Sequence, residues 1–206
     1  MGVRMGTDGT DEDVALVIDE LQPQYAIEGV KDIDDMPRPD LATMQAVRAA
    51  MMVEYDKLDD TFDTMRETTD QVDDWERFSY VTAGAWGLSA DENAMYKPYG
   101  LDDAKGGACY TATYPEVPAK AFLSITVYGP EKYLMSNEDN IVSSNRGINF
   151  NDDGSFSVAF GGEECRDLAP NFAATPEDGW SFLMRAYQPD VEAFQAYELP
   201  EIAAAD

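Results

Sequence analysis

The chain has 206 residues, with 41 aspartates and glutamates against 14 lysines and arginines, a formal net charge of −27 and no histidine. The missing imidazole excludes Ser-His-Asp and Cys-His catalysis, and histidine-based zinc or iron sites, within one copy of the chain. Because phosphate backbones and anionic lipids repel so acidic a surface, neither nucleic acid nor a membrane is expected as a partner.

The acidic residues are spread along the whole chain instead of forming a tail. A dispersed acidic shell is typical of proteins that stay soluble in salt, and it predicts a marine or halophilic source or a virus that infects such a host. The sequence shows no apolar leader and no apolar run of the ~18 residues that a membrane span needs. We therefore expect a cytoplasmic protein, with a virus-encoded origin left open.

Residues 1–39 are predicted to form an acidic, loosely ordered N-terminal arm. Within this arm, Asp11 to Leu21 carries an apolar face and predicts a short helix that is ended by Pro23. The stretch 31–39, KDIDDMPRP, combines proline with charge and predicts a linker.

Residues 40–88 are predicted to form a helical layer. Apolar residues recur at steps of three and four from Leu41 to Met65, which predicts one amphipathic helix of about six turns. Asp40, directly after a proline, is the expected N-cap. We expect the apolar side of this helix to pack on its own domain.

Two further helical pieces are predicted. The first runs from Val72 to Ala85, with large aromatic anchors that include Trp75 and Trp86. The second is the stretch 89–96, SADENAMY, which predicts a capped helical turn because Ser89 stands three residues before Glu92.

Beyond residue 106 the hydrophobic period changes to two. Four segments rich in aromatic and β-branched residues are predicted strands: 107–114, 120–128, 155–160 and 180–187. NDDGS at 151–155 predicts a hairpin turn of the Asp-Gly kind, and YGPEKY at 128–133 predicts another turn. Residues 89–206 therefore predict an antiparallel β-sandwich, in a mainly β fold with N-terminal helices.

Four stretches also carry a resemblance: ENAMY (92–96), YPEVPAKAFLSITVYGPEKYLMSNEDN (114–140), NFNDDGSFSVAF (149–160) and WSFLMRAYQPDVEAF (180–194). In order and spacing they resemble the domain of unknown function 1214 family, the C-terminal module of the paired 1254/1214 domain proteins. The resemblance implies a jelly-roll-like β-sandwich. It implies no reaction and no site residues.

The two cysteines, Cys109 and Cys165, form no CxxC pair and match no zinc or redox motif. A disulfide between them is the alternative if their strands are neighbours. We expect two free, partly buried thiols instead.

Candidate ligand-binding residues come from aromatic side chains, oxygen-rich loops and the few cations. Tyrosines on a sandwich face, beside amides and carboxylates, form a platform on which sugars stack. Arg185 lies in the middle of a strand, where arginine is costly unless paired, so we predict a bond to a buried carboxylate such as Glu92. The rival interpretation is a clamp for an anionic ligand. The predicted ligand-binding residues are Tyr96, Tyr114, Asn137, Asp139, Asn140, Arg146 and Arg185.

Carboxylate pairs in loops offer the remaining chemistry. Glu163 with Glu164, and Glu138 with Asp139, could serve a glycosidase that holds two carboxyl groups about 5 to 9.5 Å apart. Solvated turns are the favoured interpretation of both pairs, because carboxylates are so frequent in this chain. We expect no metal ion and no cofactor.

The sequence thus favours an acidic, salt-adapted, non-catalytic binding or assembly module. Expected partners are a small-molecule or glycan ligand and further copies of the chain, with the N-terminal helices in the contact. Two alternatives stay open: a carboxylate-dependent hydrolase that acts on a glycan, and a structural component of a viral particle.

Overall fold

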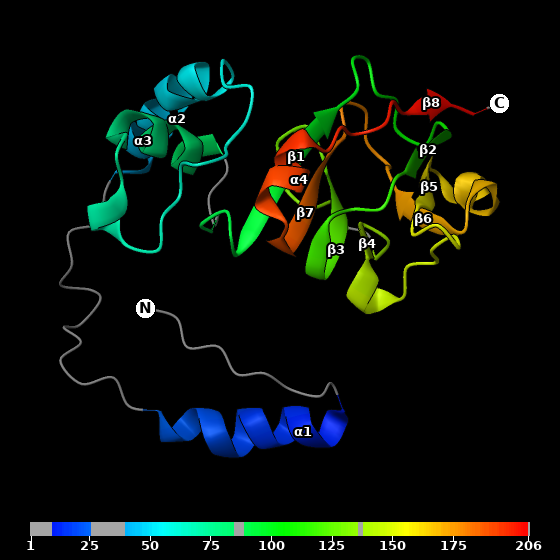
Figure 1. Ribbon diagram of the computed structural model, residues 1–206, viewed down its shortest axis with the longest axis horizontal. Helices are drawn as coiled ribbons and strands as arrows, with labels where there is room; N and C mark the ends of the chain where they lie inside the picture. Colours follow the sequence, from blue (N-terminus) through cyan, green and yellow to red (C-terminus); the bar gives the residue numbers. More distant parts are fainter. Residues whose placement is uncertain (1–9, 26–39, 85–88, 136–137, 206) are drawn as a thin grey trace. The chain divides into compact units, whose positions relative to one another are not determined.

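The computed structural model describes residues 10–25, 40–84, 89–135 and 138–205 (Figure 1). It divides into two compact units, Met1–Gln45 and Ala46–Asp206. The predicted linker 31–39 lies outside the described residues, and so does the anchor Trp86.

The N-terminal helix lies where the sequence predicts it. α1 (Asp11–Ala15) continues as the π-helical η1 (Leu16–Leu21) and ends in one 3₁₀ turn, η2 (Gln22–Gln24). The Thr10 side chain caps this helix, because its Oγ1 accepts a hydrogen bond of 3.2 Å from the Asp13 amide.

α2 (Leu41–Tyr55) begins at the predicted cap. The Thr43 amide donates to Asp40 Oδ2 at 2.9 Å, and this bond holds the pKa of Asp40 below its usual value. The helix ends ten residues before Met65, so the predicted length is wrong. Beyond Tyr55 the backbone bonds locally to side chains, as where the Phe62 amide donates to Asp60 Oδ1 at 3.0 Å, and such bonds compete with a helix.

The apolar stripe of α2 is also not covered as expected. No side chain of α2 is buried, and Leu41, Met44 and Val47 are 67%, 51% and 49% exposed. The expectation that this stripe packs on its own domain is therefore wrong for its first half, Leu41 to Val47, whereas Met51 and Tyr55 are half-buried.

α3 (Trp75–Gly84) confirms the second predicted helix to within three residues at each end. It packs on the second half of α2: Arg48 Nε donates to the Ala83 carbonyl at 3.1 Å. A side chain at Gly84 would overlap the Tyr55 ring, so this close approach requires glycine. A 3₁₀ turn, η4 (Thr69–Gln71), lies between the two helices.

Within the described residues, eight strands form two four-stranded sheets, drawn as two layers in Figure 1. Sheet A has the order β1 (Ala94–Gly100), β7 (Ser181–Pro189), β3 (Ala119–Tyr128), β4 (Ile141–Ser143), with all pairs antiparallel. Sheet B has the order β6 (Asn171–Ala174), β5 (Phe156–Gly161), β2 (Tyr110–Tyr114), β8 (Ala203–Ala204), in which β5 and β6 are parallel. Short helices η5 (Ser144–Arg146), η6 (Glu163–Leu168) and α4 (Val191–Ala196) complete the fold. This arrangement confirms the predicted mainly β, jelly-roll-like sandwich with helices on its N-terminal side.

Aromatic side chains join the two sheets in one core. The Phe182 ring of sheet A lies 5.8 Å from Phe160 and 6.2 Å from Tyr114, both of sheet B. Because strand side chains alternate, burial of Phe182, Met184 and Ala186 turns the odd-numbered residues of β7 away from the core.

The predicted helical turn at 89–96 is wrong in its second half. Only one turn forms, where the Asn93 amide donates to the Ala90 carbonyl at 2.9 Å, and from Ala94 the chain is β1. Cross-strand pairing with β7 explains the difference, because it supplies backbone hydrogen-bond partners and side-chain neighbours that an isolated turn lacks.

Both predicted turns form. The Gly129 amide donates to the Tyr133 carbonyl at 3.0 Å, and the Gly154 amide donates to the Asn151 carbonyl at 3.0 Å. Gly154 has a φ of +80°, which favours glycine. The second turn is not a hairpin between paired strands, because β4 before it belongs to sheet A and β5 after it to sheet B.

Cys109 and Cys165 form a disulfide with a Cα–Cα distance of 5.3 Å, so the expectation of free thiols is wrong. After β5 the chain folds back through η6, which brings Cys165 beside the start of β2, the neighbour of β5. Gly161 permits this return, since a Cβ there would collide with Cys165 Sγ.

Candidate ligand-binding face

The outer face of sheet A, called here the Arg185 face, presents the side chains that alternate with the core residues. Arg185 lies at its centre, opposite Tyr96 on β1 and Ser124 on β3. From the strand register, the face consists of Ala94, Tyr96, Pro98, Phe122, Ser124, Thr126, Tyr128, Ile141, Ser143, Ser181, Leu183, Arg185 and Tyr187. Six of these residues are buried: Ala94, Tyr96, Ser124, Thr126, Ser143 and Ser181.

Two neutral hydroxyl groups hold the half-buried Arg185 side chain. Nη1 donates to Thr126 Oγ1 at 2.7 Å, and Nη2 donates to the Tyr128 hydroxyl. The guanidinium carbon also lies 5.7 Å from the centre of the Tyr128 ring, within the range of a cation–π contact. Its positive charge therefore has polar partners but no negative one among the described residues.

The predicted ion pair between Arg185 and Glu92 is wrong. Glu92 is exposed in the turn before β1, whereas Arg185 pairs in register with Tyr96, four residues further along the chain. Cross-strand neighbours on β3 reach the guanidinium instead.

Aromatic rings flank Arg185 on its other side. Phe122 and Tyr187 pair across β3 and β7, and their rings stack with centroids 3.9 Å apart and an interplanar angle of 15°. Tyr96 is 8% exposed, and burial raises the pKa of its hydroxyl. The face thus combines a cation, hydroxyl groups and a flat apolar surface.

A second cation reaches the same face from the turn after β3. Lys132 Nζ donates to Ser181 Oγ at 3.0 Å, and Ser181 is the cross-strand partner of Tyr128. The four strands of sheet A contain no aspartate or glutamate. The strands of sheet B share this absence, so the carboxylates that give the chain its net charge of −27 lie outside the described strands of both sheets.

The remaining hydrogen-bonding capacity of Arg185 indicates what the face can bind. A guanidinium has five N–H donors in a planar fork, and the two hydroxyl groups use only part of this fork. Carboxylate and phosphate groups match the free edge in charge and geometry. The arrangement therefore suits an anionic group.

Tyr114, another predicted ligand-binding residue, lies in the core. Its side chain is fully buried between the sheets, stacked 5.1 Å from Phe156, and its hydroxyl has no hydrogen-bond partner. Burial raises the pKa of this hydroxyl far above the usual value. The structure therefore does not bring Tyr114 to the Arg185 face.

The other predicted residues are not among the strand side chains of this face. Asp139 accepts a hydrogen bond of 2.7 Å from Arg166 Nη2, and Asn140 Nδ2 donates to the Met135 carbonyl at 3.4 Å. Arg146 is exposed in η5, and Asn137 lies outside the described residues. Of the predicted set, the structure brings together Tyr96 and Arg185.

The predicted ligand-binding residues do not include the β3 residues beside Arg185. The alternation in KAFLSITVY places Phe122, Ser124, Thr126 and Tyr128 on one face of a strand, and this signal could have found them. Lys132 follows in a turn, and no sequence pattern connects it to Ser181.

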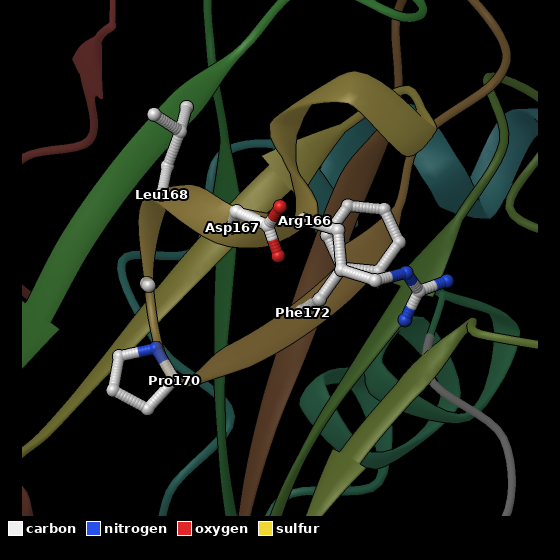
Figure 2. Close-up of a pocket in the computed structure, with 6 residues that line it drawn as sticks. Arg166, Asp167, Leu168, Pro170 and Phe172 are labelled. Atoms are coloured by element: carbon white, nitrogen blue, oxygen red, sulfur yellow. The ribbon is translucent and has the colours of Figure 1, made fainter.

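A surface pocket of about 620 Å³ lies on the other sheet, between η6 and β6 (Figure 2). In the pocket, Arg166 lies over the Phe172 ring at 4.3 Å, and its guanidinium donates to Glu163 at 2.6 and 2.8 Å and to Asp139 at 2.7 Å. These carboxylates already satisfy the cation. Arg166 also lowers the pKa of Glu163, whereas the acid of a glycosidase needs a raised pKa.

In the described part of the chain, no group of three or more cysteine and carboxylate side chains is placed to hold a metal ion. No helix in the same part of the chain has the length and apolar character of a membrane span.

Comparison with known proteins finds a family match within the sandwich. Residues 95–191 match the family model described as "Protein of unknown function (DUF1214)". This finding confirms the resemblance seen in the sequence, and its description states no activity. No curated protein matches the chain.

Two solved structures are similar to this chain. The VPA0106 protein from Vibrio parahaemolyticus has a TM-score of 0.60 and 20% identity, over 84% of this chain and 48% of that one. A putative uncharacterized protein from Burkholderia cenocepacia has a TM-score of 0.45 and 14% identity, over 58% of this chain and 32% of that one. This chain therefore spans about half of the first protein, with which it shares a fold.

Proposed function

We propose that this protein, whose residues 95–191 match the DUF1214 family model, is a non-catalytic binding module that holds a small organic anion on its Arg185 face. The ligand places a carboxylate or phosphate group on the guanidinium of Arg185. Its apolar part lies toward the stacked rings of Phe122 and Tyr187.

One observation carries this proposal: Arg185 is half-buried, yet among the described residues it is bonded to two hydroxyl groups and to no carboxylate. Holding a guanidinium partly out of water costs free energy unless an anion compensates it. The chain has 41 acidic residues that could have supplied this anion. A ligand supplies it instead.

The acidic surface belongs to the same proposal. With a net charge of −27, the molecule repels anions at long range, and salt screens this repulsion. We infer that the protein works in a salty environment, where a small anion reaches the face. Rising stability with added NaCl, measured by thermal unfolding, supports this inference, and highest stability without salt would contradict it.

The disulfide bears on where the protein works. Disulfides persist in oxidising compartments and are rare in the cytoplasm. The Cys109–Cys165 bond therefore favours an oxidising compartment over the cytoplasmic location expected from the sequence. Thiol alkylation of the protein in intact cells, before lysis, checks this: a disulfide resists the reagent, whereas thiols labelled in the folded protein would restore the cytoplasmic location.

A titration followed by ¹H–¹⁵N NMR tests the binding function. Propionate is added at constant ionic strength to wild type, Arg185→Gln and the control Arg146→Gln, which removes an exposed arginine elsewhere. We expect saturable shifts in β3 and β7 for wild type and the control, and an affinity at least tenfold weaker for Arg185→Gln. Equal affinities of the three proteins, or no saturable shift in any of them, would overturn the proposal.

A further inference from the structure

Two cations approach the same end of the Arg185 face from different elements. The Arg185 side chain leans along the strands toward Tyr128, to which its Nη2 donates. The Lys132 side chain comes from the following turn and donates to Ser181 Oγ at 3.0 Å. Tyr128 and Ser181 are direct cross-strand partners, so the two cations are anchored on one row of the sheet.

Neither cation is neutralised within the described residues. Both are bonded to hydroxyl groups, and the strands beneath them contain no aspartate or glutamate. Other cations of the protein do have acidic partners: Arg66, Arg77 and Arg166 each form an ion pair. Lys97, Lys120 and Arg146 also form no ion pair among the described residues. What distinguishes this row is that two such cations are anchored on it.

We propose that the ligand of this face is a small dianion, whose two negative charges bridge Arg185 and Lys132. This inference rests on the proposed function, which requires only the Arg185 contact. A dicarboxylate and a phosphate monoester share the required chemistry. In both cases the planar guanidinium takes two oxygens, and the ammonium acts as a point charge on the remaining oxygen atoms.

The two anchors are expected to make different contributions to affinity. Arg185 is half-buried and its fork is oriented by two hydroxyl groups, so it sets the position of any bound anion. Lys132 is exposed on a turn, where it adds attraction for a second charge and contributes little to binding of the first.

The experiment compares anions that differ in charge. Malonate, propionate and inorganic phosphate are titrated at pH 8 and constant ionic strength into wild type, Lys132→Gln and Arg185→Gln. Lys120→Gln is the matched control, since Lys120 is an exposed lysine on β3 without an ion pair among the described residues. Affinities are measured by ¹H–¹⁵N NMR.

We expect wild type to bind malonate at least tenfold more tightly than propionate. Lys132→Gln should reduce malonate affinity to that of propionate and leave propionate unchanged, Arg185→Gln should weaken both, and Lys120→Gln should change neither. Stronger binding of phosphate than of malonate assigns the dianion to the phosphate class, and the reverse assigns it to the dicarboxylates.

The two proposals fail in different ways. If malonate keeps its advantage in Lys132→Gln, or has none in wild type, the dianion inference is overturned, while weaker propionate binding by Arg185→Gln still supports the binding function. If no anion depends on Arg185, both proposals are overturned.

Discussion

Arg166 and Arg185 lie on the outer faces of opposite sheets, and their surroundings differ. Arg166 covers Phe172 of sheet B and is bonded to Glu163 and Asp139. The Arg185 side chain extends from β7 to β3 of sheet A, where it is bonded to the hydroxyl groups of Thr126 and Tyr128. Carboxylates of the same chain compensate Arg166, whereas Arg185 has no such partner in the described part of the chain.

Under the proposed function, this difference separates a structural arginine from one that binds the ligand. On sheet B a cation, two carboxylates and the disulfide fix η6 to the sheet. On sheet A the hydroxyl groups orient the guanidinium without cancelling its charge. Substituting the side chains that hold η6 on sheet B should therefore lower the stability of the fold. Substituting side chains of the Arg185 face should weaken anion binding.

Loss of the disulfide should have the largest effect on folding. The bond closes a loop with a sequence separation of 56, and chain entropy assigns about 4 kcal/mol of stability to a loop of this size. We expect the double variant Cys109→Ala, Cys165→Ala to lose about this free energy of unfolding in urea. Wild type in reducing agent should behave similarly, and an unchanged unfolding midpoint in both would show that η6 is held without the bond.

The Tyr114 hydroxyl tests whether the core takes part in binding. It is buried without a hydrogen-bond partner, so Tyr114→Phe should leave the protein as stable or stabilise it by about 1 kcal/mol. The matched control is Tyr197→Phe, which removes a hydroxyl that donates to the Pro115 carbonyl at 3.0 Å and should cost about 1 kcal/mol. Loss of anion binding in Tyr114→Phe would move the site from the outer face to the core.

The loss of folding stability at low pH should depend on Arg166 and not on Arg185. Hydrogen bonds from Arg166 lower the pKa of Glu163 below its ordinary value of 4.5. A lowered folded-state pKa contributes stability that is present above pH 4.5 and lost as the pH falls through the folded-state value. We therefore expect Arg166→Gln to be less stable at neutral pH and to change less on acidification, as followed by thermal unfolding.

Arg185→Gln is the control for that measurement. The hydroxyl partners of Arg185 carry no charge in acid. The stability of Arg185→Gln should therefore fall with pH as that of wild type does. If both variants differ equally from wild type in the stability they lose on acidification, the distinction between the two arginines is contradicted.

The smallest effect on folding is expected at Arg185 itself. Arg185→Gln loses hydrogen bonds to two hydroxyl groups but also removes an uncompensated charge, so its free energy of unfolding should stay within about 0.5 kcal/mol of wild type. A loss several times larger, measured in urea, would make Arg185 a structural residue like Arg166.

Sequence alone predicted most of the sandwich because its longer strands carry a clear period of two. Residues 120–128 and 180–187 correspond to β3 and β7 within two residues. β4 and β8 have three and two residues, too few to show a period. The predicted length of α2 was too great because the apolar spacing continues into a segment where Asp60 accepts a hydrogen bond from the local backbone.

The candidate site was predicted in part. Arg185 was singled out because a charge in the middle of a strand requires a partner, but the partner depends on the register between β3 and β7. This register brings together residues almost sixty positions apart, and no local pattern encodes it. The disulfide was missed for the same reason, because it depends on how η6 returns to the start of β2.

The bond between Cys109 and Cys165 also makes part of the chain a covalent ring. β2, β3, β4 and β5 all lie within this ring, so it contains strands from both sheets. A protease that cuts once between residues 110 and 164 therefore cannot release either fragment. The nicked protein should migrate as two pieces on a gel with reductant and as one piece without it.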